Sequence, residues 1–96
     1  MPITTHPGEI LREEFLEPMG LSVDAPALAL RVPVSRMNGI VHERRAVTAD
    51  TALRLARYFG TTPQFRMNLQ TNHDLSMAAH DHGGEIERDI QPREAA

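Results

Sequence analysis

Residues Leu21–Arg45, LSVDAPALALRVPVSRMNGIVHERR, decide the fold because they predict two short helices separated by a sharp break. Either Ser22 or Asp24 is suited to accept hydrogen bonds from the free N–H groups at the start of the first helix. Pro26 favours the later start, because proline is tolerated in the first turn of a helix but disrupts its interior. We therefore expect Asp24 to cap a helix whose apolar face ends at Leu30.

The break falls at residues 31–33, Arg-Val-Pro. A proline pushes the residue before it out of the helical region and is itself well suited to the first position of a helix. The sequence therefore predicts a second helix from Pro33 to about Val41, placed back to back with the first across a short connection. This is the geometry of a helix-turn-helix motif.

The helix predicted over residues 33–41 has a buried face and an outward face. Met37, Ile40 and Val41 fall at spacings i, i+3 and i+4, which predicts an apolar stripe. The outward residue types suit the major groove of DNA, where arginine pairs with guanine, asparagine with adenine and valine with the thymine methyl group. An ordinary solvent-exposed helix face contains the same residue types. The candidate base contacts are Val34, Ser35, Arg36, Asn38 and Gly39.

The formal net charge of −3 is unusual for a nucleic-acid-binding protein, but the charges are unevenly distributed. Residues 31–57 contain six arginines against two acidic residues, whereas both flanking parts of the chain are acidic. Every basic residue is an arginine, whose planar group of donors binds phosphate or guanine through two bonds. The block of His42, Arg44 and Arg45 therefore predicts phosphate contacts, which supply the non-specific part of DNA affinity.

Three further helices are predicted from local signals. Residues 9–20, EILREEFLEPMG, place two apolar side chains four apart, and residues 48–60, TADTALRLARYFG, form a helix capped by Thr48 and stopped by Gly60. Residues 62–63, Thr-Pro, begin another helix, in which Phe65 and Leu69 share an apolar face. We expect the glycine pair at 83–84 to end this helix, so the domain spans residues 1–83.

The tail, residues 84–96, contains two isoleucines four residues apart in an otherwise charged segment. This spacing suits a helix face and a strand face equally. The isoleucines favour docking across a dimer interface over a frayed terminus. The candidate dimer contacts are Leu75, Ile86 and Ile90.

The absence of several features narrows the function. There is no cysteine, which excludes disulfides and fits a reducing cytoplasm. The N-terminal stretch MPITTHPGEI does not have the form of a secretion signal, and the longest apolar run, Ala25–Leu30, is too short to span a membrane. We therefore expect a cytoplasmic protein.

No catalytic motif is present, because the sequence lacks HExxH, a glycine-rich phosphate loop and a nucleophile elbow. We therefore expect neither enzyme activity nor a cofactor. The one cluster of metal-binding residue types is His73, Asp74, His80, Asp81 and His82. A solvated polar helix end explains this cluster better than a zinc site, which needs fixed ligands, so no metal ligand is assigned.

The assembled pattern resembles the HigA-type antitoxins of type II toxin–antitoxin systems, in the Cro/repressor-like helix-turn-helix family. The resemblance is carried by HPGEILREEFLEPMGLS at 6–22, by RVPVSRMNGIVHERRAVTADTALRLARYFGTTPQFRMNLQ at 31–70 and by GEIERDIQP at 84–92. It covers most of the chain. The opening HPGEIL together with TADTALRLARYFGT is a specific signature.

The resemblance implies an all-α, five-helix, lambda-repressor-like DNA-binding domain that forms a homodimer, binds a palindromic operator and represses its own operon. It also implies a partner, a HigB-type toxin with a RelE fold that cleaves mRNA on the ribosome. Carried over by position, the base contacts fall on the five outward residues given above. The phosphate contacts fall on Arg44, Arg45 and Thr48, with Ser22 added at the start of the helix that ends at Leu30.

The chain departs from the family pattern at Arg31, where a glycine is usual in the turn, and at Asp24 and Pro26. These departures leave open an interaction module that neutralises a toxin with a degenerate helix-turn-helix. A stand-alone phage-type repressor without a toxin is the other alternative. For toxin contact we expect an acidic helix face to complement a basic partner, formed by Glu9, Glu13, Glu14 and Glu17.

Overall fold

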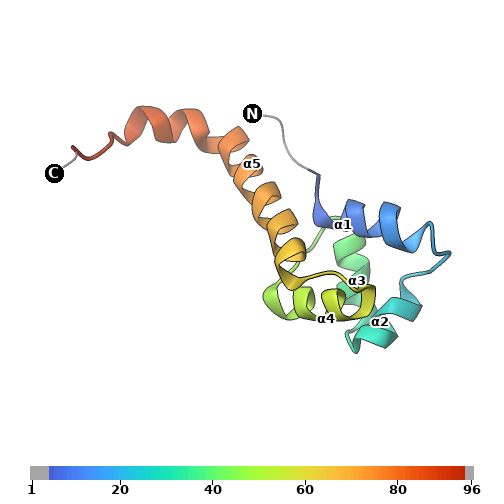
Figure 1. The fold of residues 1–96 in the computed structure, drawn as a ribbon. Helices are drawn as coiled ribbons and strands as arrows, with labels where there is room; N and C mark the ends of the chain where they lie inside the picture. Colours follow the sequence, from blue (N-terminus) through green and yellow to red (C-terminus); the bar gives the residue numbers. More distant parts are fainter. Residues whose placement is uncertain (1–4, 95–96) are drawn as a thin grey trace.

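The structure is a computed structural model that describes residues 5–94; residues 1–4, where the N-terminal stretch discussed above begins, and 95–96 lie outside it. The elements are α1 (Pro7–Ile10), the π-helix η1 (Leu11–Leu16), α2 (Asp24–Leu30), α3 (Val34–Val41), α4 (Ala49–Phe59) and α5 (Pro63–Asp89). Because η1 continues α1 without interruption, residues 5–94 form five helices and no strand (Figure 1). The expected all-α, five-helix fold is confirmed.

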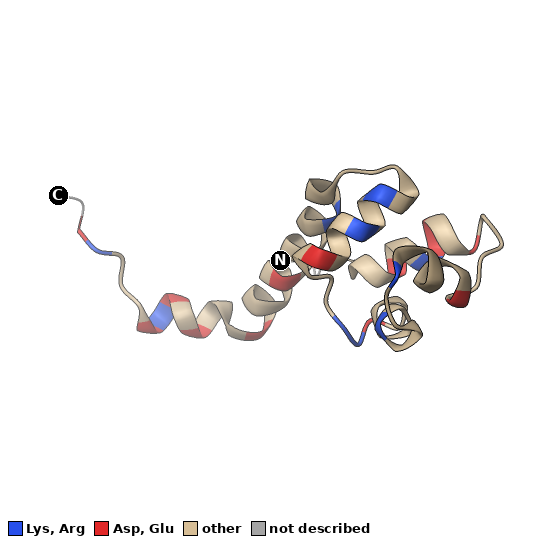
Figure 2. Ribbon diagram, turned by 90° about the horizontal axis from the view of Figure 1, so that it is seen from below, with Lys and Arg blue, Asp and Glu red and all other residues tan. Residues whose placement is uncertain are grey.

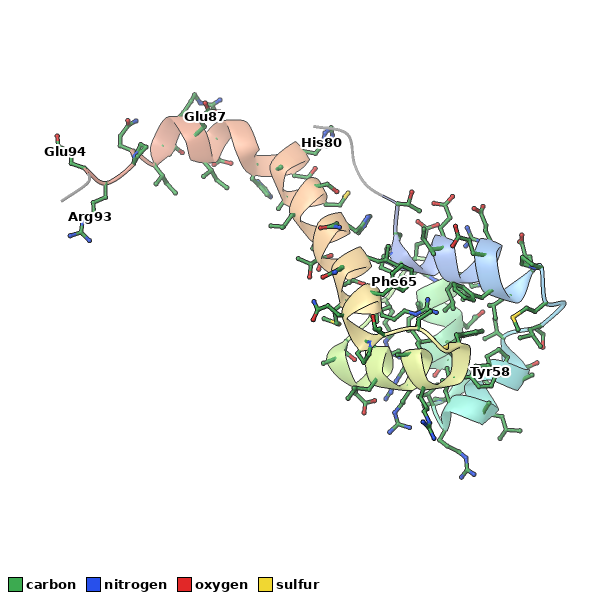
Figure 3. The ribbon with its side chains drawn as sticks, viewed as in Figure 1. Tyr58, Phe65, His80, Glu87, Arg93 and Glu94 are labelled. Atoms are coloured by element: carbon green, nitrogen blue, oxygen red, sulfur yellow. The ribbon has the colours of Figure 1, made fainter. Side chains whose placement is uncertain are left out.

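The core lies where the first four helices meet, and α5 covers only part of it. Buried apolar side chains come from η1, α2, α3 and α4, and from the connections after α2 and α3. The first half of α5 packs on α4 and α1, but no described residue after Ser76 is buried. The second half of α5 therefore projects from the body, and Glu87 lies on this projecting part (Figures 1 and 3).

The beginning of α1 is built by His6, Pro7 and Gly8. The Nδ1 atom of His6 accepts a hydrogen bond from the Gly8 N–H at 2.9 Å and so caps the helix. Pro7 occupies the first turn, where no N–H is needed. The helix therefore begins at Pro7, two residues before the predicted start at residue 9, and its cap is the buried imidazole of His6.

His6 also contacts α5. Its ring lies edge-to-face against the ring of His73, with 4.9 Å between the centroids. Burial is the main cause that lowers the pKa of His6, and the neighbouring His73 lowers it further. The neutral imidazole is therefore favoured, which matches its role as a hydrogen-bond acceptor at the cap.

The segment after α1 winds as a π-helix, with hydrogen bonds between residues five apart, such as Glu17 N–H to the Arg12 carbonyl at 2.9 Å. The wider turn brings Leu11 and Leu16, five residues apart, into the core. Phe15, which the four-residue spacing paired with Leu11, is only half-buried. The predicted helix is confirmed, but its winding changes which residues share the buried face.

The start of α2 agrees with the later of the two predicted positions. Asp24 is the first residue of the helix and Pro26 lies buried in its first turn. The predicted cap is wrong, because Val23 occupies the cap position and no side chain makes a capping hydrogen bond there. Ser22 lies before the helix and is exposed.

The last two helices begin as predicted. Thr48 occupies the N-cap position of α4 as predicted but makes no side-chain capping hydrogen bond, and Gly60 ends the helix in a left-handed conformation with φ 73°. The Thr62 hydroxyl accepts a hydrogen bond from the Phe65 N–H at 3.0 Å at the start of α5. The predicted stop at residues 83–84 is wrong, because α5 continues to Asp89. Extending an existing helix is cooperative and outweighs the low helix propensity of two glycines.

The buried side of α5 is polar, which the sequence pattern did not predict. Its buried residues are Arg66, Gln70 and Ser76, whereas Phe65 is exposed and Leu69 is half-buried. The guanidinium carbon of Arg66 lies 4.6 Å from the centroid of the Phe15 ring and also over the rings of two other phenylalanines. Desolvation by these neighbours lowers the pKa of Arg66. The expected apolar face of Phe65 and Leu69 is therefore not the face that packs.

Candidate nucleic-acid interface

The turn between α2 and α3 reverses at Arg31, which adopts a left-handed conformation with φ 59° and ψ 41°. This conformation costs a residue other than glycine about 1 kcal/mol or more. Nη1 of Arg54, on α4, donates a hydrogen bond to the Leu30 carbonyl at 2.9 Å and lies 3.4 Å from the Arg31 carbonyl. A side chain from α4 therefore holds the turn in place.

α3 begins at Val34, one residue later than predicted. Pro33 is its cap residue in an extended conformation, with ψ 143°, because the chain is still emerging from the turn at that point. The predicted buried stripe is confirmed, since Met37, Ile40 and Val41 are almost completely inaccessible.

The opposite side of α3 faces outward as predicted. Val34 and Ser35 are exposed, and Arg36 and Asn38 are half-buried. Gly39 behaves differently, because a β-carbon at this position would lie 3.3 Å from the β-carbon of Arg45. The space beside Gly39 is therefore occupied by the chain's own arginine.

The loop between α3 and α4, residues 42–48, contains the basic block and is called the basic loop here. Its backbone is held at both ends. The Gly39 carbonyl accepts hydrogen bonds from the N–H groups of Arg44 and Arg45, at 2.8 and 3.1 Å. At the other end, the buried Val47 N–H donates to Oε1 of Gln70 on α5 at 2.7 Å. The two predicted phosphate-binding arginines are exposed on a loop whose backbone is held in place.

Three of the predicted DNA-contacting residues come together around one hollow. The hollow has a volume of about 340 Å³ and lies between α3, the basic loop and the start of α4. Its lining comprises Arg36, Arg45, Ala46, Thr48, Asp50 and Thr51. Ser22, at the start of α2, is not among the lining residues. The structure thus assembles a concave site with two arginines and two hydroxyl groups, a combination suited to a phosphate or a base edge.

Asp50 also lines this hollow. The sequence pattern did not predict this acidic residue as part of the site. Its Oδ2 atom is 3.3 Å from Nη1 of Arg36 and 3.0 Å from Nε of Arg54. The Asp50–Arg54 pair has the i, i+4 spacing of a helix-surface ion pair, which is a signal in the sequence. The link to Arg36 crosses between helices and has no such local signal.

The acidic residues predicted for toxin contact lie on α1 and η1 or just after them. Glu13, Glu14 and Glu17 are exposed, and Glu9 is half-buried. Acidic residues also recur along the projecting part of α5, whereas α4 carries arginines (Figure 2). The negative charge therefore lies mainly outside the hollow, except for Asp50.

Two of the three candidate dimer contacts lie on α5, the third follows it directly, and all three are exposed. The exposed fractions are 65% for Leu75, 50% for Ile86 and 64% for Ile90, which follows the end of α5. Large apolar side chains exposed along one projecting element are typical of a protein–protein contact.

Two further classes of site were tested on residues 5–94. No group of three or more metal-ligating side chains there is placed to hold a metal ion. Within the same residues, no helix combines the length and the apolar character needed to cross a membrane.

Comparison with known proteins identifies the family. No protein-family model matches the chain. Virulence-associated protein I of Dichelobacter nodosus is 63% identical over 76 residues, which cover 79% of this chain and 70% of the Dichelobacter protein. A solved antidote protein of the HigA family from Coxiella burnetii is 43% identical with a TM-score of 0.90, and the match covers 96% of this chain and 100% of that one.

A second solved structure, Pseudomonas aeruginosa antitoxin HigA with the higBA promoter, is 48% identical with a TM-score of 0.91. The match covers 94% of this chain and 98% of the Pseudomonas chain. Both solved relatives are therefore matched over nearly their whole length, including the helix-turn-helix and α5. The chain belongs to the HigA family of helix-turn-helix antitoxins.

Proposed function

We propose that this protein is a cytoplasmic, homodimeric antitoxin that represses its own operon and neutralises a HigB-type toxin by direct binding. Repression would use α3, which enters the major groove of a palindromic operator. The observation that carries this proposal is the hollow that brings Arg36, Arg45 and Thr48 together at the exposed side of α3. The Pseudomonas relative, which was solved with the higBA promoter, supports operator binding as the activity.

The position of the arginines argues for two kinds of DNA contact. Arg36, on α3, is placed for the base edges, because recognition helices present their outward residues to the major groove. Arg44 and Arg45 lie on the exposed loop and are placed for the phosphate backbone. Phosphate contacts orient the protein on any duplex, and the contacts from α3 would then select a sequence.

A palindromic operator requires two copies of α3 about one helical turn apart, roughly 34 Å, and therefore a dimer. We place the dimer contact on the exposed apolar residues of α5, because burying them between two copies would remove apolar surface from water. The mass measured by sedimentation equilibrium tests this assignment. A monomer at the concentrations that give operator binding would contradict it.

For the toxin we propose the acidic face that includes Glu13 and Glu14. Both side chains are exposed and lie on η1, outside the hollow, so DNA and toxin would use different surfaces. The negative charges of these glutamates repel phosphate, which also argues against a DNA role for this face. A basic protein partner, by contrast, would be attracted to it.

The experiment that tests the proposed function is a mobility-shift titration of purified protein on two duplexes of equal length. One contains the DNA upstream of the protein's own gene, and the other has a random sequence. A repressor should prefer the first duplex, and both affinities should fall as salt is raised. Equal binding to both duplexes at every salt concentration would favour the toxin-neutralising module with degenerate DNA binding.

Binding to a toxin distinguishes the proposed antitoxin from the stand-alone repressor. A purified toxin from the neighbouring open reading frame should form a stable complex with the antitoxin in size-exclusion chromatography. The absence of such a reading frame and of any complex would favour a repressor that acts without a toxin.

The observed turn geometry favours a working helix-turn-helix, because Arg54 stabilises the unusual conformation at Arg31.

A further inference from the structure

A chain of side-chain contacts links both helices of the helix-turn-helix to α4. Asp50 Oδ2 contacts Arg36 of α3 at 3.3 Å and Arg54 of α4 at 3.0 Å. Arg54 in turn donates to the Leu30 carbonyl at the end of α2 at 2.9 Å. One carboxylate oxygen therefore lies between the arginine that faces DNA and the arginine that holds the turn.

The contact restricts Arg36 without covering it. Nη1 of Arg36 is engaged by Asp50, and the Arg36 side chain remains 33% exposed where it lines the hollow. A guanidinium has five donors in one rigid plane, so fixing one edge sets the direction of the remaining donors. An arginine held in this way loses less conformational freedom on binding a base than a free one does.

The negative charge that makes this contact, that of Asp50, lowers DNA affinity in general. Asp50 has an exposed side chain and adds a negative charge to a hollow that otherwise offers arginines to phosphate. Exposed ion pairs contribute little to folding, although Asp50 also lies in the first turn of α4, where a negative charge is favourable. A charge that weakens binding to every duplex improves discrimination where it weakens the non-matching duplexes more than the matching one.

We propose that Asp50 is a specificity-determining positioning residue, which directs Arg36 toward a base and holds it back from neighbouring phosphates. Arg54 keeps Asp50 in place from the opposite side. This inference rests on the proposed operator binding and adds that an acidic residue of α4, which itself donates nothing to DNA, sets how selectively α3 reads the sequence.

The test begins with a duplex that wild-type protein selects from a random library. Dissociation constants are then measured for this duplex and for a random one, at fixed salt, with wild type, Asp50→Asn and Glu43→Gln. Asp50→Asn should bind the random duplex about threefold more tightly, because one negative charge is removed. Its preference for the selected duplex should fall about three- to tenfold, as expected for the loss of a coupled contact.

Glu43→Gln is the matched control, because it removes one exposed, ion-paired negative charge within the basic loop, where Glu43 contacts Arg12 and not Arg36. It should strengthen both duplexes alike and leave the preference unchanged. Asp50→Glu keeps the carboxylate and should restore most of the preference. In an Arg36→Ala background, Asp50→Asn should no longer alter the preference, because the residue through which it acts is absent. Circular dichroism melts confirm that each variant is folded.

The experiment distinguishes failure of the proposed operator binding from failure of the proposed role of Asp50. If wild-type protein selects no duplex, the proposed operator binding fails and this inference fails with it. If wild type selects a duplex but Asp50→Asn behaves like Glu43→Gln, only the role of Asp50 is overturned. A loss of preference that persists in the Arg36→Ala background would likewise overturn it, because Asp50 would then act by another route.

Discussion

Gly8 lies so close to the backbone of Ile40 that a β-carbon at position 8 would stand 1.8 Å from the Ile40 carbonyl oxygen. The start of the N-terminal helix is thereby packed directly on α3, the helix proposed to read DNA. No side chain can replace this contact without moving one backbone away from the other. Gly8 therefore sets how closely α1 approaches α3.

We expect Gly8→Ala to lower the free energy of unfolding by about 3 kcal/mol, at the upper end of the cost of overpacking, because the clash involves backbone atoms. Gly84→Ala is the matched control, since its added carbon would make only an ordinary contact, 3.6 Å from Nη1 of Arg88. Alanine should stabilise that exposed helix position by about 0.5–1 kcal/mol. Urea denaturation measures both changes, and equal effects of the two substitutions would contradict the packing argument.

Arg36→Ala and Arg45→Ala should impair operator binding in different ways. Arg36→Ala should cost about 1–3 kcal/mol on the operator and relax the preference at one base pair. Arg45→Ala should weaken binding to all sequences alike and flatten the dependence of affinity on salt. Titrations at several salt concentrations separate the two effects. Arg57→Ala removes an exposed arginine of α4 that does not line the hollow and serves as the control.

If Arg36→Ala changes neither the affinity nor the base preference, the assignment of the DNA-facing side of α3 is wrong. A base-specific loss in the Arg45 variant would instead move the selective contact to the loop after α3.

Reversing the charge of the acidic face should slow toxin binding. The double substitution Glu13→Arg and Glu14→Arg is expected to reduce the association rate with a basic HigB-type toxin about tenfold at low salt. Glu85→Arg with Glu87→Arg makes the same change of charge on the projecting part of α5, and sedimentation equilibrium checks that this variant, which flanks Ile86, is still a dimer. Surface plasmon resonance compares the two variants. Equal slowing by both would mean that net charge matters and the position of the acidic face does not.

Stability should fall in mildly acidic solution because of His6, whose pKa is lowered in the folded protein by burial. Above the ordinary histidine pKa of about 6.5 the side chain is neutral in both states, so its contribution to stability is complete. As pH falls below this value, the unfolded chain binds the proton first and stability is lost. The loss continues until pH reaches the lowered pKa of the folded state.

Thermal melts of wild type and His6→Asn between pH 7.5 and 5.5 check this expectation. Asparagine keeps a side-chain acceptor at the cap but does not titrate in this range. The melting temperature of the variant should therefore depend less on pH than that of wild type. Parallel curves for the two proteins would assign the acid sensitivity to other groups.

The sequence predicted those elements whose signals are local. The start of α4 after Thr48 and its stop at Gly60 follow the signals in the sequence, although the Thr48 side chain makes no capping hydrogen bond. The buried stripe of α3 also follows directly from its spacing. Contacts between distant segments were not predictable in this way. Arg66 is buried because aromatic rings from η1 and α4 lie against it, and no pattern within α5 announces those partners.

In the candidate site, too, local features were predicted from the sequence and contacts between distant residues were not. Arg36 and the basic loop were predicted from residue type and position, because exposed arginines on and after a helix are visible in the sequence. The role of Gln70, which binds the Val47 N–H from the middle of α5, was not predictable, since 23 residues separate the two. Gly39 was predicted to face DNA, but Arg45 fills the space beside it.

The position of Arg54 has an electrostatic consequence for α2. The carbonyl groups at the end of a helix carry a partial negative charge, and only three residues separate the end of α2 from the start of α3. The guanidinium of Arg54 lies against the last of these carbonyls, on Leu30, and offsets that charge. The partial negative charge at the end of α2 is therefore offset inside the turn that leads into α3.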